Sequence, residues 1–162
     1  MASPSGQTTM DPEGLLTPEN IADLARVITT EAGGVNETAQ AMVGWTVLNR
    51  MKRHTLTKVT EVWGQYAHGH FSTATSLNLA EKILDGSAMD ISQGATHFYS
   101  PTSMPKAEER TSGSDVLGGL ETVTGVTKNG KPVQNYRPGW TIGFARIYVP
   151  GVQEKDFKFY RQ

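Results

Sequence analysis

Glu31 is the residue whose type and position most clearly suggest chemistry. It follows Ile28 by three residues and Leu24 by seven, so it lies on or beside the apolar stripe of a helix. Loss of hydration there favours the protonated carboxyl and raises its pKa, as a general acid near neutral pH requires. The alternative is an acid at the edge of the stripe that is solvated or paired with Arg26 or Lys52.

His68 and His70 are a second candidate for chemistry. Two histidines at this spacing can chelate a metal only in an extended segment, and they need a third ligand, for which His54 and His97 remain. No His-Glu-x-x-His motif, P-loop, dinucleotide fingerprint or Gly-x-Ser-x-Gly elbow is present. We therefore expect no metal and no cofactor, and a histidine–metal amidase is kept as an alternative.

The elements that position Glu31 are predicted to be helices. Thr17-Pro18-Glu19 is a helix start, with a capping hydroxyl and a proline at the first helical position, and Gly33-Gly34 ends that helix. Glu31 lies in the last turn of this helix, where the negative, C-terminal end of the helix dipole disfavours a second negative charge. This effect raises the pKa of Glu31 further. Gly44, inside the next helix, permits close packing against the first.

Further helices are predicted in the first half of the chain, and strands in the second. Expected in order are a helix over 37–54 capped by Asn36, a short helix or turn over 57–66, and a helix capped by Ser76 that ends at Asp85-Gly86. Then come a strand over 95–99, a loop over 100–115, a turn of helix over 115–121, a hairpin of 122–128 and 131–135 around Asn129-Gly130, and a strand over 141–149.

Length and composition limit the class of protein. The 162 residues suit one domain, predicted over 17–162 after a flexible polar segment over 1–16. A net charge of -1 argues against nucleic acid as a partner, and the absence of cysteine excludes disulfides. No apolar run is long enough for stable membrane insertion, and the first residues lack the pattern of a Sec signal.

Several motifs, in collinear order over about residues 21–148, resemble the SleB/CwlJ-type cell-wall hydrolases. The resemblance rests on an acid-Ala-x-Gly core within Leu24–Gly34, then Gln40, Val47-Leu-Asn-Arg-Met51, Gly69-His-Phe-Ser72, the helical segment 80–86, Gly94-Ala-Thr-His-Phe-Tyr-Ser-Pro101, Trp140 and Ile142-Gly143. Each motif alone is weak, and their order carries the resemblance.

The resemblance implies a peptidoglycan-cleaving enzyme with Glu31 as its catalytic acid. It also implies an α+β, lysozyme-like fold, in which a helical N-terminal part and a smaller β-rich C-terminal part surround a cleft. Two positions depart from the family pattern: Gly33 replaces a basic residue, and Val35 replaces an acid, with Glu37 displaced by two. These departures affect contacts at the rim of the site and leave Glu31 in place.

Seven further residues are candidates for binding the substrate. For each, a purely structural role is the alternative: a surface glutamine, a loop anchor, or an aromatic residue of the core. His97 and Tyr99 alternate along the strand and should share a face, and a bulge near Pro101 would bring Thr96 to the same side as Tyr99. Trp63 and Tyr66 are further candidates for stacking on sugars. The candidates for substrate binding are Gln40, Phe71, Ser72, Thr96, His97, Tyr99 and Trp140.

A single acid favours a lytic transglycosylase over a hydrolase. Hydrolysing glycosidases usually use a pair of carboxylates. Glu37, Glu61, Asp85 and Asp90 are candidates for the second carboxylate only because they are acids. A transglycosylase instead uses the 6-hydroxyl of the muramic acid and forms a 1,6-anhydro sugar. A hydrolytic muramidase and a non-catalytic glycan-binding module remain alternatives.

The expected partner, the glycan strand of peptidoglycan, lies outside the cytoplasmic membrane. Without a Sec signal, we expect the protein to reach the cell wall or periplasm through phage lysis, as part of a virion, or through specialised secretion. Secretion as an antibacterial effector implies an immunity protein or a delivery apparatus as a further partner.

Overall fold

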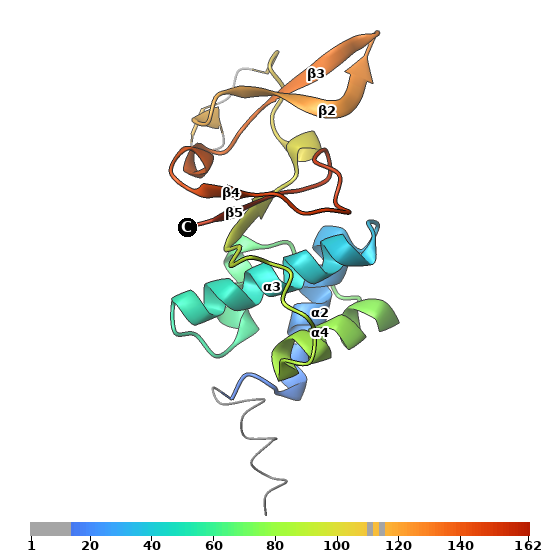
Figure 1. Cartoon of the computed structure of the whole chain (residues 1–162), viewed down its shortest axis with the longest axis vertical. Helices are drawn as coiled ribbons and strands as arrows, with labels where there is room; N and C mark the ends of the chain where they lie inside the picture. Colours follow the sequence, from blue (N-terminus) through green and yellow to red (C-terminus); the bar gives the residue numbers. More distant parts are fainter. Residues whose placement is uncertain (1–13, 110–111, 114–115) are drawn as a thin grey trace, which may run out of the picture. The chain divides into compact units, whose positions relative to one another are not determined.

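The computed structural model describes residues 14–109, 112–113 and 116–162. The chain separates into two compact units, residues 1–94 and 95–162, here called the N-terminal and C-terminal units (Figure 1). The division falls where the sequence predicts the change from helices to strands, and the mixture of helix and sheet confirms the α+β class. Most of the predicted flexible segment lies outside the described residues. Leu15 is only 3% exposed, so the folded part begins before Thr17.

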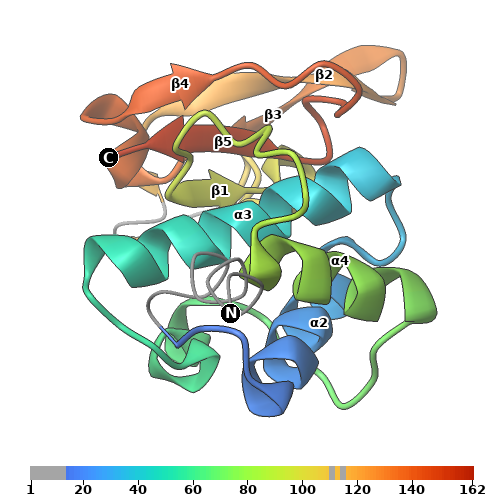
Figure 2. The same cartoon turned by 60° about the horizontal axis from the view of Figure 1, so that its bottom comes forward.

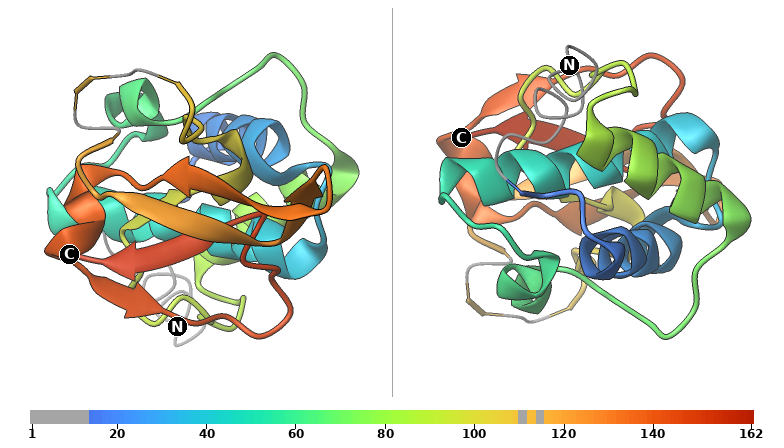
Figure 3. Two further views of the ribbon diagram at one scale, coloured as in Figure 1. Left: turned by 90° about the horizontal axis from the view of Figure 1, so that it is seen from above. Right: turned by 90° about the horizontal axis from the view of Figure 1, so that it is seen from below.

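The described part of the N-terminal unit contains three α-helices: α2 (Pro18–Ala32), α3 (Glu37–Arg53) and α4 (Ala74–Asp85). They pack against one another in pairs, as Figure 2 and, from below, Figure 3 show. The predicted caps of the first two are confirmed. Thr17 Oγ1 accepts from the N–H of Asn20 at 3.0 Å, and Asn36 Oδ1 accepts from the N–H of Ala39 at 2.9 Å.

The predicted cap of the third helix was wrong. Thr73 caps α4, and Ser76 is the third helical residue, where its side chain bonds back to Thr73 in a capping box. Ser76 is fully buried, and its Oγ lies 2.6 Å from Thr29 Oγ1 on α2. The Ser76 hydroxyl, which the sequence predicted to be a helix cap, therefore links α4 to α2 through Thr29.

Close packing of the helices depends on Gly44 of α3, as predicted. A Cβ at this position would come within 2.6 Å of Ile83 on α4 and 3.0 Å of Ile28 on α2. The predicted short helix or turn over 57–66 consists of two 3₁₀ turns, Val59–Glu61 and Trp63–Gln65. No helix in the described part of the chain is long and apolar enough to cross a membrane.

The C-terminal unit contains two antiparallel sheets. One has the order β1 (His97–Tyr99), β5 (Lys158–Arg161), β4 (Ala145–Ile147), and the other pairs β2 (Leu120–Lys128) with β3 (Lys131–Tyr136). The predicted hairpin turn is confirmed, since Asn129 and Gly130 both have positive φ, 54° and 76°, as a type I′ turn requires.

The predictions for the rest of this unit were only partly right. The strand expected over 141–149 shortens to β4, because a 3₁₀ turn over Gly139–Ile142 occupies its start and Thr141 Oγ1 bonds to the carbonyl of Pro138 at 2.7 Å. The turn of helix expected over 115–121 is confirmed in part: Val116 lies in a 3₁₀ turn, whereas Leu120 and Glu121 already belong to β2, and Asp115 lies outside the described residues. The middle strand β5 was not predicted. A further 3₁₀ turn, Pro101–Ser103, follows β1.

Candidate active site

Glu31 lies half-buried in the last turn of α2, with no basic residue in that turn. Its Oε2 accepts a hydrogen bond from the N–H of Ala67 at 3.1 Å. No cation among the described residues pairs with it: Arg26 lies 3.7 Å from Asp23, and Lys52 is exposed. Glu31 is thus a partly desolvated carboxyl without a counter-ion.

The loop of residues 66–72 is tied to the C-terminal half of α2 beside Glu31. The N–H of Gly69 donates to Thr30 Oγ1 at 2.7 Å, and Arg26 Nε donates to the Gly69 carbonyl at 2.5 Å. A Cβ on Gly69 would meet Thr30 Oγ1 at 3.1 Å, so glycine permits this approach. These bonds position Ala67 to donate to the carboxylate.

Burial raises the pKa of Glu31, and the Ala67 hydrogen bond opposes this to a smaller extent. Tyr66, the neighbour of Ala67, is 8% exposed, and burial raises its pKa as well. The positive charge of Arg50 lowers the pKa of Tyr66, whereas the negative charge of Glu31 raises it. The charges of Arg50 and Glu31 therefore both act on Tyr66, whereas burial and the Ala67 hydrogen bond account for the shifted pKa of Glu31.

Arg50 and Ala67 are site residues that were not singled out from the sequence. The guanidinium of Arg50 lies 6.0 Å from the centre of the Tyr66 ring. A signal for Arg50 was present, because it follows Val47 by three residues and Val43 by seven, the offsets that identified Glu31. Ala67 acts through its backbone N–H, for which the sequence offers no signal.

The other predicted site residues of the N-terminal unit differ in environment. Gln40 is 6% exposed, so it is not a surface residue; its Nε2 donates to the Val35 carbonyl at 3.1 Å, and its Oε1 has no partner among the described residues. Phe71 is 81% exposed, which argues against a loop anchor, and Ser72 is exposed beside it. Phe71 and Ser72 belong to the 66–72 loop that bonds to α2.

The two neighbouring histidines do not act as a pair. His68 stacks on Trp63 with ring centres 4.3 Å apart, and its Nδ1 lies 3.1 Å from the Tyr66 carbonyl, whereas His70 is exposed. Within the described ranges, no three histidine, aspartate or glutamate side chains gather as metal ligands do. That no metal or cofactor is used stays a prediction.

In the C-terminal unit, His97 and Tyr99 share a face of β1, as predicted. The ring of Trp140 lies 5.1 Å from that of His97 and 5.7 Å from that of Tyr99, and Phe144 extends the cluster at 4.7 Å from His97. His97, Trp140 and Phe144 remain partly exposed.

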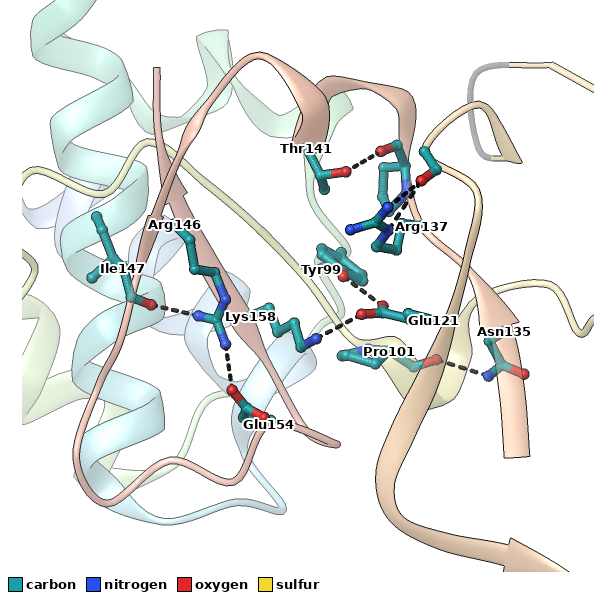
Figure 4. Close-up of polar contacts among 12 residues, drawn as sticks. Tyr99, Pro101, Glu121, Asn135, Arg137, Thr141, Arg146, Ile147, Glu154 and Lys158 are labelled. Atoms are coloured by element: carbon teal, nitrogen blue, oxygen red, sulfur yellow. Dashed lines mark hydrogen bonds and ion pairs between the residues drawn. The ribbon is translucent and has the colours of Figure 1, made fainter. Parts of the chain in front are cut away.

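Tyr99 also belongs to a polar group, which Figure 4 shows. Its hydroxyl donates to Glu121 Oε2 at 2.6 Å, and Lys158 Nζ lies 2.6 Å from Glu121 Oε1. Burial, and then the hydrogen bond to Glu121, raise the pKa of Tyr99. Its 7% exposure indicates a structural role for most of the side chain.

The expectation that a bulge brings Thr96 beside Tyr99 was wrong. β1 pairs with β5 in unbroken register from His97 to Tyr99, and Thr96 precedes the strand. Thr96 is 5% exposed, and its Oγ1 accepts from the N–H of Gln162 at 2.9 Å and lies 3.0 Å from His97 Nδ1. Thr96 therefore positions His97 within the unit.

No family model, curated protein or solved structure matches this chain. The resemblance to SleB/CwlJ-type hydrolases thus stays a prediction from its motifs. What the structure adds is two groups of candidate residues, each within its own unit: Glu31 with Tyr66, Arg50 and the 66–72 loop, and the aromatic cluster around Trp140.

Glu31→Gln is expected to stabilise the protein at neutral pH. The raised pKa means that folding disfavours the charged carboxylate, so stability falls as pH rises above the unfolded pKa of about 4.3. Glutamine has no charge to desolvate, and we expect a gain of about 0.5–2 kcal/mol in the free energy of unfolding at pH 7. The gain should disappear near pH 3.5, where the carboxyl is protonated in both states.

Urea denaturation at the two pH values measures this difference. The matched control is Glu81→Gln, an exposed acid on α4, which should change the stability little at either pH. A gain from Glu31→Gln that is the same at both pH values would contradict the electrostatic explanation.

Proposed function

We propose that this chain cleaves the bond between MurNAc and GlcNAc in peptidoglycan glycan strands, with Glu31 as general acid and base. The observation that carries the proposal is the half-buried carboxyl of Glu31, whose pKa is raised by burial and which has no cationic partner in the described part of the chain. A carboxyl with a raised pKa keeps its proton to a higher pH than a free carboxyl and can donate it to a glycosidic oxygen. The resemblance in motif order supports the choice of this residue and of this substrate.

The proposed reaction is a lytic transglycosylation. Glu31 gives its proton to the glycosidic oxygen as the bond to the muramic acid C1 breaks. The resulting carboxylate, to which Ala67 donates a hydrogen bond, then takes the proton of the 6-hydroxyl of the same sugar. The 6-oxygen bonds to C1 and closes a 1,6-anhydro ring, and Glu31 ends protonated again.

A one-acid mechanism also agrees with the other acids considered from the sequence. Glu61 Oε1 accepts from the N–H of Lys58 at 2.9 Å. Asp85 and Asp90 accept from the N–H groups of Ser87 and Ser92, at 2.7 and 2.9 Å. These three carboxylates cap turns, and Glu37 is exposed in the first turn of α3.

The proposal extends to the fold and to the substrate contacts. It includes a lysozyme-like arrangement with a cleft, in which exposed Phe71 and the partly exposed ring of Trp140 contact the sugar rings. The place of action belongs to the same proposal, since peptidoglycan lies in the cell wall or periplasm. Delivery by phage lysis, a virion or specialised secretion, and an immunity partner, are further parts of it.

Mass spectrometry of purified peptidoglycan digested by the protein tests the reaction. We expect soluble muropeptides that end in 1,6-anhydro-MurNAc, each 18 Da lighter than the hydrolysed product. Reducing ends would instead assign a hydrolytic muramidase. Products cleaved at the amide of the stem peptide, with chelator-sensitive activity, would assign a metal amidase, and binding without products would assign a glycan-binding module.

A further inference from the structure

A cavity of about 440 Å³ lies wholly within the C-terminal unit, between the segment 102–108 and the β2–β3 hairpin. This volume is in the range of small-molecule and peptide sites. None of its lining residues belongs to the Glu31 group or to the aromatic cluster around Trp140. Its lining consists of Thr102, Lys106, Ala107, Glu108, Val123, Val126, Lys128, Asn129, Lys131, Pro132, Val133, Gln134 and Asn135.

The shape of the hairpin contributes to the cavity. The register between β2 and β3 shifts between Thr122 and Thr127, where Gly125 has φ 79°. Such an irregularity bends a strand away from its partner. Val123 is buried, and Val126 and Val133 are half-buried, so the cavity presents aliphatic surface.

The charges around the cavity are predominantly positive. Lys106, Lys128 and Lys131 face one lining acid, Glu108, and none of the three lysines forms an ion pair with an acid of the described chain. Lys128 and Lys131 are directly opposite each other across the hairpin. Like charges in opposed positions repel, and a bound anion would relieve that repulsion.

One buried polar atom also lacks a partner here. Asn135 is 1% exposed, and its Nδ2 donates to the Pro101 carbonyl at 2.8 Å, which fixes the orientation of the amide. Its Oδ1 points away from Pro101 in Figure 4 and has no donor among the described residues. A buried acceptor of this kind favours a ligand that brings an N–H group.

We propose that this cavity binds a short peptide with small aliphatic side chains and a free C-terminal carboxylate. The peptide carboxylate lies among the lysines, and the aliphatic side chains of the peptide contact the valines. A peptide N–H donates a hydrogen bond to Asn135 Oδ1. Inorganic or sugar phosphates would satisfy the lysines but leave the valine surface uncovered. Peptidoglycan stem peptides have this chemistry, and for that biological source the inference rests on the proposed function.

The test is peptide binding by the full-length chain, followed by NMR and calorimetry. The probe is N-acetylated trialanine with two D-alanines at its C-terminus, compared with the same peptide amidated at the C-terminus. We expect methyl shifts at Val123, Val126 and Val133, and binding of the amide at least about tenfold weaker, as loss of a charge-assisted contact implies.

The lysines are tested by Lys128→Met/Lys131→Met, which should weaken peptide binding at least about tenfold. The matched control, Lys82→Met on α4, should leave binding unchanged, since Lys82 is exposed in the other unit. Both lysines of the double variant are exposed beside the hairpin turn, so folding should persist.

Equal binding of acid and amide, unchanged binding by the double variant, or displacement of the peptide by glycerol phosphate at equal concentration would each overturn the peptide site. The experiment is independent of cleavage, because Glu31→Gln should bind the peptide as the wild type does. If the peptide binds but no glycan is cleaved, only the proposed function fails. If glycan is cleaved but no peptide binds, only the peptide site fails.

Discussion

Replacing Glu31 by glutamine is expected to lower the rate of peptidoglycan cleavage by about 10²–10⁴-fold, the range that general acid–base catalysis supplies. Glutamine retains the size of the side chain and an oxygen that can accept from the N–H of Ala67. It cannot, however, donate a proton to the glycosidic oxygen or remove one from the attacking hydroxyl. Release of soluble muropeptides from purified cell walls measures the loss.

Two acids provide matched controls for this experiment. Glu37 and Glu81 are exposed on α3 and α4, so Glu37→Gln and Glu81→Gln should retain nearly full activity. Sedimentation with insoluble cell walls should show that Glu31→Gln still binds its substrate. If Glu31→Gln kept more than about a tenth of the wild-type rate, Glu31 would not be the general acid.

The second large effect concerns the stability of the C-terminal unit. Lys158→Met should lower its free energy of unfolding by about 3 kcal/mol, because it leaves Glu121 charged and unpaired in a buried position. The side chains of Glu121 and Lys158 are only 8% and 17% exposed. Hydrogen exchange of the amides in β1, β4 and β5 reports the stability of this unit.

A second change should reverse most of this loss. In Glu121→Gln/Lys158→Met no charge is left buried, and the glutamine oxygen can still accept from the Tyr99 hydroxyl. Glu154→Gln is the control, since this acid pairs with Arg146 at 3.0 Å but is 42% exposed, and its loss should cost below about 1 kcal/mol. A double variant no more stable than Lys158→Met would contradict a charge-based cause.

The elements predicted well are those specified by local interactions. Thr17 and Asn36 cap their helices through hydrogen bonds three residues away, and Asn129-Gly130 forms a turn through its own backbone preferences. β5 and the true extent of β4 were missed because strands of three or four residues depend on pairing with distant partners. Ser76 was misassigned because a buried hydroxyl and a capping hydroxyl are the same residue type.

In the candidate site, too, the features set by local patterns were predicted and the contact between distant residues was not. Periodicity placed Glu31 on or beside the apolar stripe of its helix, and the structure shows a half-buried carboxyl there. Alternation placed His97 and Tyr99 together, and both contact Trp140. The N–H of Ala67 reaches Glu31 across 36 positions of the chain, a contact that folding alone creates.

The strand order β1-β5-β4 has a consequence for how the chain is made. β5 is the last of the three strands to leave the ribosome, yet it forms the middle of their sheet. β1 and β4 do not pair with each other, so neither has a strand partner in that sheet until Lys158–Arg161 emerges. The helices of the N-terminal unit rely on nearer contacts and can assemble while synthesis continues. Cutting the chain before Lys158 would therefore remove the centre of that sheet and leave two separate single strands.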